Sequence, residues 1–184
     1  MKVSAITNFP EVQRQLARLG TDVYGRAAVS AMNKTVAKAR TAMSREIRSE
    51  FNLSASVVND GLRVRRASLV NGLAHIEAVL ESPSRHGRAM NLIHFSATQT
   101  KAGVSVKIKR VGGKKVVRSA FIANKGRTVF RRTGETRLPI EPVQTIAVQQ
   151  MFNTRRIKEV VMQMMRDEFP AQFAVAARYF GQNA

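Results

Sequence analysis

The sequence predicts an α+β fold, with helices at both ends of the chain and an antiparallel sheet or meander between them. Apolar residues recur every three or four positions in the first and last thirds, which is the spacing of amphipathic helices. Between them apolar and polar residues alternate, as on strands with one buried face. We expect a single domain of 184 residues. It should be helical over 8–60, rich in strands and mobile basic loops over 62–140, and helical again over 142–181.

Three helices are predicted in the N-terminal region. Asn8 is the expected cap of a short first helix, and Thr21 caps a longer, alanine-rich one. The narrow apolar stripe of this second helix is typical of close packing against a partner element, which could be a neighbouring subunit. Ser54 or Ser56 then starts a helical turn that Gly61 closes. The stripe consists of Met32, Val36, Ala39, Met43 and Ile47.

Strand periodicity replaces helical periodicity near residue 62. Asn71 and Gly72 predict a tight hairpin, and alternating residues follow as far as Leu80. Glycine turns at 112–113 and 124–126 then divide the chain, so we expect a three-stranded meander with positively charged outer faces over 104–132. The clearest inward-facing set on this meander consists of Val104, Val106 and Ile108.

The C-terminal region is predicted to be helical after two prolines. Pro139 and Pro142 exclude a helix where they stand, and helical spacing returns at Val143, Ile146 and Met151. The last helix should be the most apolar one, kinked or restarted at Pro170. Its broad apolar face is predicted to contain Ile157, Val160, Val161, Met164, Met165, Phe173, Ala177 and Phe180.

Positive charge is concentrated in the middle of the chain. The formal net charge is +19, and residues 82–134 carry thirteen basic side chains and no acidic one. Such a segment repels itself, so we expect it to face outward, either mobile or held against a negative partner. Nine of these cations lie in KRVGGKKVVRSAFIANKGRTVFRRTG, residues 109–134. The candidates for contact with a partner or DNA are Lys114, Lys115, Arg118, Lys125, Arg127, Arg131 and Arg132.

No constellation of side chains predicts catalysis, a metal or a cofactor. The chain has no cysteine, and its three histidines lack the spacing of metal ligands. His75 and His94 are expected on strands and His86 in a loop. A magnesium-dependent nuclease would require folding to gather Glu77, Glu81 and Glu135, which are distant in sequence. No membrane span or signal peptide is predicted, so we expect the chain to be made in the cytosol.

Nucleic acid is a partner class that the charge alone leaves open. Phe121 and Phe130 interleave with arginines, as in proteins that stack on single-stranded bases. Successive strand residues face opposite ways, however, so the rings could equally be core while the arginines are solvated. No sequence-reading motif is present, and any grip on DNA would be electrostatic and strongly dependent on salt.

Three stretches, in this order, resemble the lambda-type prophage minor tail protein Z family. They are RAAVSAMNKTVAKARTAMSREI, then LSASVVNDGLRVRRAS, then SAFIANKGRTVFRRTGETRLPIEPV, and the likeness spans residues 20 to 155. The motif positions carried over are structural ones: Ala120, Phe121, Ile122, Leu138, Pro139 and Ile140.

The resemblance implies a non-enzymatic virion component of a long-tailed bacteriophage. In this reading it is a minor tail or tail completion protein at the head-proximal end of the tail, assembled in the host cytoplasm. It also implies contact with other tail and neck proteins, a homo-oligomeric ring guessed to be a hexamer, and non-specific contact with phage DNA. The alternative is a free protein that binds nucleic acid without sequence specificity.

Overall fold

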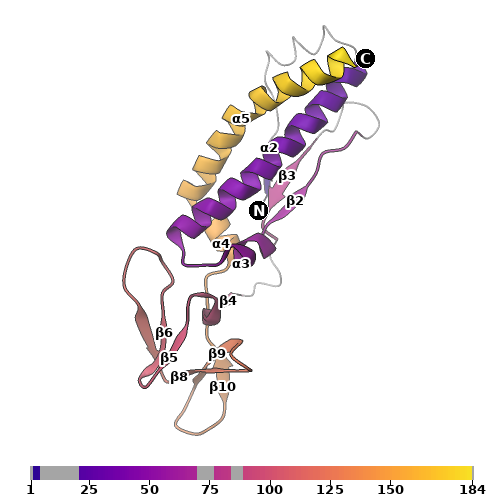
Figure 1. Cartoon of the computed structure of the whole chain (residues 1–184). Coiled ribbons are helices and arrows are strands. Elements are labelled where there is room, and N and C mark those ends of the chain that lie inside the picture. Colours follow the sequence, from indigo (N-terminus) through magenta and orange to yellow (C-terminus); the bar gives the residue numbers. More distant parts are fainter. Residues whose placement is uncertain (1, 5–20, 70–76, 84–88, 184) are drawn as a thin grey trace. The chain divides into compact units, whose positions relative to one another are not determined.

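The computed structural model describes residues 2–4, 21–69, 77–83 and 89–183 of the chain (Figure 1). Helices occur in the first and last parts and antiparallel strands between them, which confirms the predicted α+β class. The chain forms two compact units, whereas the single domain stays a prediction. Unit 1 comprises Met1–Met43, Leu62–Ser82 and Arg155–Ala184, and unit 2 comprises Ser44–Gly61 and Pro83–Thr154.

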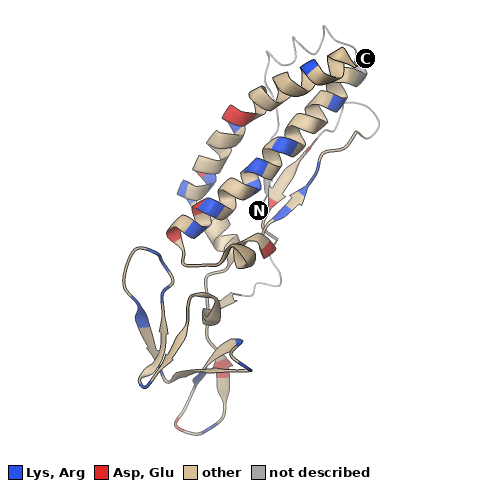
Figure 2. Cartoon of the chain, viewed as in Figure 1, with Lys and Arg blue, Asp and Glu red and all other residues tan. Residues whose placement is uncertain are grey.

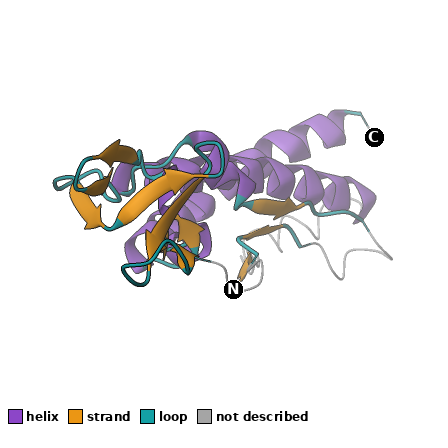
Figure 3. Cartoon of the chain, turned by 90° about the horizontal axis from the view of Figure 1, so that it is seen from below, coloured by secondary structure: helices purple, strands orange, loops and turns teal. Residues whose placement is uncertain are grey.

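Unit 1 is built around two long helices, α2 (Thr21–Glu50), whose last residues belong to unit 2, and α5 (Arg155–Gln182). They lie side by side in unit 1, as Figures 1 and 3 show. The rings of Tyr24 and Phe173 stack between them with centroids 6.2 Å apart. The predicted stripe of α2 is confirmed, because all five of its residues are buried.

The apolar face of α5 is narrower than predicted. Its buried residues follow mostly in steps of four: Ile157, Val161, Met165, Phe169, Phe173 and Ala176. A residue one position earlier lies about 100° round the helix, which is why Val160 is 44% exposed. Phe169 and Ala176 belong to this buried stripe and were not predicted. The helix passes through Pro170 without restarting.

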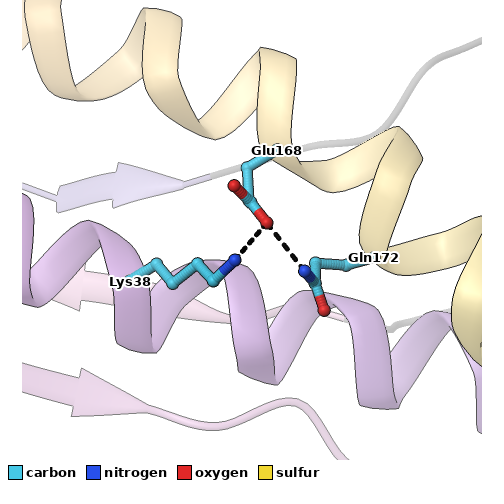
Figure 4. Close-up of polar contacts among 3 residues, drawn as sticks. All are labelled: Lys38, Glu168 and Gln172. Atoms are coloured by element: carbon cyan, nitrogen blue, oxygen red, sulfur yellow. Dashed lines mark hydrogen bonds and ion pairs between the residues drawn. The ribbon is translucent and has the colours of Figure 1, made fainter.

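Polar contacts tie the elements of unit 1 together. Glu168 on α5 accepts hydrogen bonds from Lys38 of α2 and from Gln172, the latter at 2.7 Å (Figure 4). The hydrogen bond from Lys38, followed by that from Gln172, lowers the pKa of Glu168 below its usual value. The amide of Asn33 brackets the backbone of Ala67, donating to its carbonyl at 3.0 Å and accepting from its N–H at 2.8 Å.

A small antiparallel sheet completes unit 1, in the order β1 (Lys2–Ser4), β3 (Val79–Glu81), β2 (Arg63–Arg65). Its register places Glu81 opposite Lys2 on one side and Arg63 on the other. Several predictions fall outside the described residues, namely the first helix from Asn8, the hairpin at Asn71 and Gly72, and the placement of His75 and His86.

Unit 2 begins with the end of α2 and the short helix α3 (Ala55–Asp60). Ser54 caps α3 by accepting a hydrogen bond from the N–H of Val57, and the helix closes at Gly61, as predicted. The remaining elements are β4 (Met90–Asn91), the 3-10 helix η2 (Leu92–His94), β5 (Thr98–Thr100), β6 (Gly103–Val106), β7 (Lys115–Arg118), β8 (Ala120–Ala123), β9 (Thr128–Arg132), β10 (Ile140–Pro142), β11 (Gln144–Thr145) and α4 (Val148–Phe152).

The predicted three-stranded meander is instead divided between two sheets, β5-β6-β7 and β10-β9-β8. The division falls at Ser119, whose positive φ of 58° turns the chain out of the first sheet between β7 and β8. Val104 and Val106 are buried as predicted, whereas Ile108 lies beyond the end of β6 and is half-buried. The turns at 112–113 and 124–126 are confirmed by positive φ at Gly112, Lys125 and Gly126 among others.

Two further predictions in unit 2 are wrong. The strands continue to Thr145, because Gln144–Thr145 pairs with Met90–Asn91, so helix begins at Val148 and not near residue 142. His94 ends the 3-10 helix η2 and does not lie on a strand, because the side chain of Asn91 caps that turn by accepting from the N–H of Ile93.

Candidate functional site

The candidate site is the basic surface of unit 2, which we define as the seven cations predicted to contact a partner. All seven are exposed. Figure 2 shows Lys and Arg positions in blue along the strands and loops of unit 2. The seven cations belong to the edge of one sheet and to the turn and end of a hairpin in the other. Lys114 and Lys115 enter β7, Arg118 ends it, Lys125 and Arg127 flank the β8–β9 turn, and Arg131 and Arg132 end β9.

The loop between β6 and β7 is anchored at its first residues to the end of α2. The backbone N–H of Asn52 donates to the carbonyl of Ile108 at 2.8 Å, and its side chain donates to the carbonyl of Lys107 at 3.1 Å. The guanidinium of Arg110 donates to the carbonyl of Arg48 at 2.7 Å. A cation at the C-terminal carbonyls of a helix is favoured by the helix dipole. These bonds fix where the loop towards β7 starts.

The sequence left open whether Phe121 and Phe130 are exposed stacking rings or core residues, and the structure places both in an intermediate position. Both rings are half-buried, and they stack on one another with centroids 6.2 Å apart. The guanidinium of Arg132 lies 5.5 Å from the centroid of the Phe121 ring, a cation–π distance. Phe121 therefore packs against its neighbours within the sheet, while Arg131 and Arg132 remain exposed.

Two amide side chains position the basic strands, and sequence reasoning missed both. Asn91 accepts from the N–H of Val129 at 2.9 Å and donates to its carbonyl at 3.1 Å, which fixes β9. Gln99 joins the two sheets, because its Oε1 accepts from the N–H of Ile122 at 2.9 Å. No local pattern distinguishes these amides from solvated ones, since their partners lie 38 and 23 residues away.

A hollow of about 540 Å³ opens between the two sheets. Its lining includes Lys101, which the sequence did not single out, and Glu135, one of the three candidate nuclease carboxylates, together with Arg132 and Phe121. Two cations and one carboxylate suit a polar or anionic chain. No group of three or more histidine, aspartate or glutamate side chains that could hold a metal ion occurs in the part of the chain that the structure describes.

The six structural motif positions of the family resemblance lie on or next to the two strands that flank β9. Ala120, buried, and Phe121 and Ile122, half-buried, lie on β8. Ile140 begins β10, preceded by the exposed Leu138 and by Pro139, which are joined by a cis peptide bond. Because the order in the sheet is β10-β9-β8, both motif segments border β9.

The three carboxylates that a nuclease would need belong to different units. Glu77 and Glu81 belong to unit 1 and Glu135 to unit 2. In unit 1 the carboxylate of Glu81 lies 3.9 Å from Nε of Arg65, an ion pair between neighbouring strands. Glu81 therefore has a structural partner.

Fold and surface together define a class: a small, strongly basic α+β protein whose exposed cations suit docking on a negatively charged partner. The model of the prophage minor tail protein Z family matches residues 9–180, so the chain belongs to this family, which confirms the resemblance. It is a structural minor tail protein of a bacteriophage, resides in the virion tail and interacts with other tail proteins.

Neither a curated protein nor a solved structure matches the chain. Among the helices of the described residues, none is long and apolar enough to cross a membrane.

Proposed function

We propose that the protein completes the phage tail at its head-proximal end as a non-enzymatic part of the virion. In this role it assembles in the host cytoplasm as a homo-oligomeric ring, for which six copies is the family-based expectation. The basic surface of unit 2 meets acidic faces of neighbouring tail or neck proteins, with non-specific contact to phage DNA as a further use of the same charges.

The exposure of all seven predicted cations, in a segment without a single acid, supports this role. Such a surface is stabilised when a negative partner supplies its counter-ions. Membership of a tail protein family makes the assembled tail the natural source of that partner.

The direct test is electron microscopy of the assembled particle with this chain located in it. A ring at the head-proximal end is expected, and tails assembled without the chain should fail to join heads. Density for the chain at the distal end, or normal particles in its absence, would overturn the proposed role.

The rival function is free, non-specific binding of nucleic acid, and the same exposed arginines give it some support. A salt titration of DNA binding by the purified protein separates the two. Saturable binding at about 150 mM salt would favour the rival, provided that the log-log salt slope is steep and falls when Arg127, Arg131 and Arg132 become Ala. Weak, unsaturable binding would favour the tail role.

The matched control removes three exposed cations from the helices of unit 1, namely Lys34, Arg166 and Arg178. Its net charge equals that of the triple variant in unit 2. A similar loss of DNA binding in both variants would mean that net charge, and not the basic surface, is responsible.

A further inference from the structure

We propose that the outer edge of β7 docks an extended acidic segment of another tail protein, which joins the β5-β6-β7 sheet as an additional strand. The inference deepens the proposed function and rests on its premise that unit 2 meets another tail protein. It places the contact on β7 and makes the partner an acidic, extended segment.

β7 is an outer strand of the two three-stranded sheets of unit 2, and the described residues show no strand that covers its free side. The facing strands β5 and β8 are bridged by Gln99, which occupies the N–H of Ile122. The outer strand β10 ends in Pro142, which has no N–H to offer. β7 pairs with β6 on one side, and no strand of the described residues pairs with it on the other.

The register shows which backbone groups of β7 point outward. Thr100 and Gly103 flank a two-residue turn and are paired, so they exchange the closely spaced hydrogen bonds of the β5–β6 hairpin. Bonding alternates along β6, so Val104 and Val106 direct their N–H and C=O groups towards Val117 and Lys115 of β7. The intervening residues of β7, Val116 and Arg118, direct theirs away from the sheet.

The side chains at this edge match an acidic, partly apolar partner. Val116 is 50% exposed, and Val111, in the loop that leads to β7, is 87% exposed. Lys114 and Lys115 precede Val116 in the chain, Arg118 follows it closely, and all three are exposed as well. Opposite charges on paired strands stabilise a sheet, so a strand bearing Asp or Glu is the complementary one.

A second copy of the chain fits this edge poorly. In an antiparallel pair of two β7 strands centred on Val116, the outward-directed residues face one another, and Lys114 would lie opposite Arg118 of the other copy. Like charges directly opposite one another destabilise such a pair, and lysine on an edge strand is a known device against self-association. The cations thus disfavour a like strand in this register, and an acidic strand is the better matched occupant.

Amide hydrogen exchange on the intact protein tests the docking directly. The probe is a capped eight-residue peptide of alternating Glu and Val, compared with one of alternating Lys and Val. The acidic peptide should slow exchange at Val116 and Arg118, while Lys115 and Val117, already bonded to β6, serve as internal references. Unchanged exchange at Val116 and Arg118 under saturating acidic peptide would overturn the inference.

Two variants then separate backbone pairing from charge. Val116→Pro removes an outward N–H at a position where an edge strand accepts proline, and it should abolish peptide binding while leaving DNA binding unchanged. Reversing Lys115 and Arg118 to Glu should weaken peptide binding about tenfold. Reversing Lys125 and Arg127 to Glu, the matched control on the β8–β9 turn, should change it little.

Three other results would count against the edge. They are full peptide binding by Val116→Pro, equal weakening by the control pair, and self-association of the wild-type chain that Val116→Pro abolishes, measured by sedimentation. If Val116→Pro does not fold, the exchange measurement on the wild-type chain decides alone. If the chain is located at the head-proximal end but the peptide does not bind, the edge docking is refuted and the proposed role stands. If the peptide binds but the chain lies elsewhere in the particle, the proposed role is refuted and the edge docking stands.

Discussion

The two units carry similar charge but neutralise it in different ways. Unit 1 has fifteen basic and seven acidic side chains, and unit 2 has sixteen and five. In unit 1 acids face cations on neighbouring elements, as Glu168 faces Lys38 and Glu81 faces Arg65. Unit 2 contains most of an acid-free stretch of more than fifty residues, residues 82–134.

The difference indicates a division of labour. Unit 1 holds itself together through a helix pair with a continuous buried stripe. Unit 2 is built mainly of short strands, two of its contacts are made by amide side chains, and its seven predicted cations are exposed. Four variants test this contrast.

The largest effect is expected from Phe173→Ala in unit 1. Phe173 is 3% exposed and stacks on both Tyr24 and Phe169, so its loss should cost about 3–5 kcal/mol of the free energy of unfolding. Native-state hydrogen exchange should show the loss at amides of unit 1. An equal loss at amides of unit 2 would instead show that the chain unfolds as one domain. Val175→Ala, exposed on the same helix, is the control.

The next largest effect is expected from Gly103→Ala in unit 2. Gly103 has φ of +139°, and a Cβ there would lie 2.1 Å from the carbonyl oxygen of Val117. The variant should lose about 2 kcal/mol, measured by urea unfolding, because both the conformation and the space exclude a side chain. Gly113→Ala, which would meet nothing within 4 Å, should change stability by less than about 0.5 kcal/mol. Equal stabilities for the two variants would contradict this reading of the sheet.

A smaller effect, of opposite sign, is expected from Thr35→Val on α2. Thr35 is 2% exposed, and its hydroxyl has no hydrogen-bond partner in the described structure. Replacing it with an isosteric apolar side chain should raise the free energy of unfolding by about 1 kcal/mol. Thr41→Val, whose exposed hydroxyl donates to the carbonyl of Ala37, should not stabilise the protein. Destabilisation by Thr35→Val would mean that the hydroxyl has a partner after all.

The smallest effect concerns pH and the contact between Lys38 and Glu168, which is partly exposed. Since folding lowers the pKa of Glu168, its contribution to stability is complete above the pKa of an unfolded glutamate, about 4.3. It is lost as pH falls through the lower pKa of the folded state. Denaturant unfolding at a series of pH values should show that Glu168→Gln lacks this component. In Lys38→Gln the free energy of unfolding should likewise depend less on pH in this range. If the wild-type profile were identical to those of both variants, the assignment would be refuted.

The helices could be predicted from the sequence because their signals are local. The stripe from Met32 to Ile47 repeats over four turns, and Ser54 and Gly61 delimit α3 by capping chemistry alone. The face of α5 was predicted too broadly, because apolar residues such as Val160 occur beside the buried stripe as well as in it.

The arrangement of strands could not be predicted in the same way. The left-handed conformation of Ser119, which divides the meander, has no signature in a serine side chain. β4 and β11 pair residues more than fifty positions apart in the chain. Because of this pairing, residues 144–145 form a strand where a helix was predicted. The exposure of the seven cations was predictable from charge, whereas the open edge of β7 depends on which strands pair.

The interleaving of the units has a genetic consequence. Unit 2 occupies two separate stretches of the chain and unit 1 three, and α2 runs across a boundary between them without a break. Neither unit is encoded by one contiguous stretch of the gene. Recombination between related phages would therefore need several crossovers to exchange a whole unit. The basic surface itself lies within the single stretch Pro83–Thr154, so it alone can be exchanged as one segment while the rest of the scaffold is inherited.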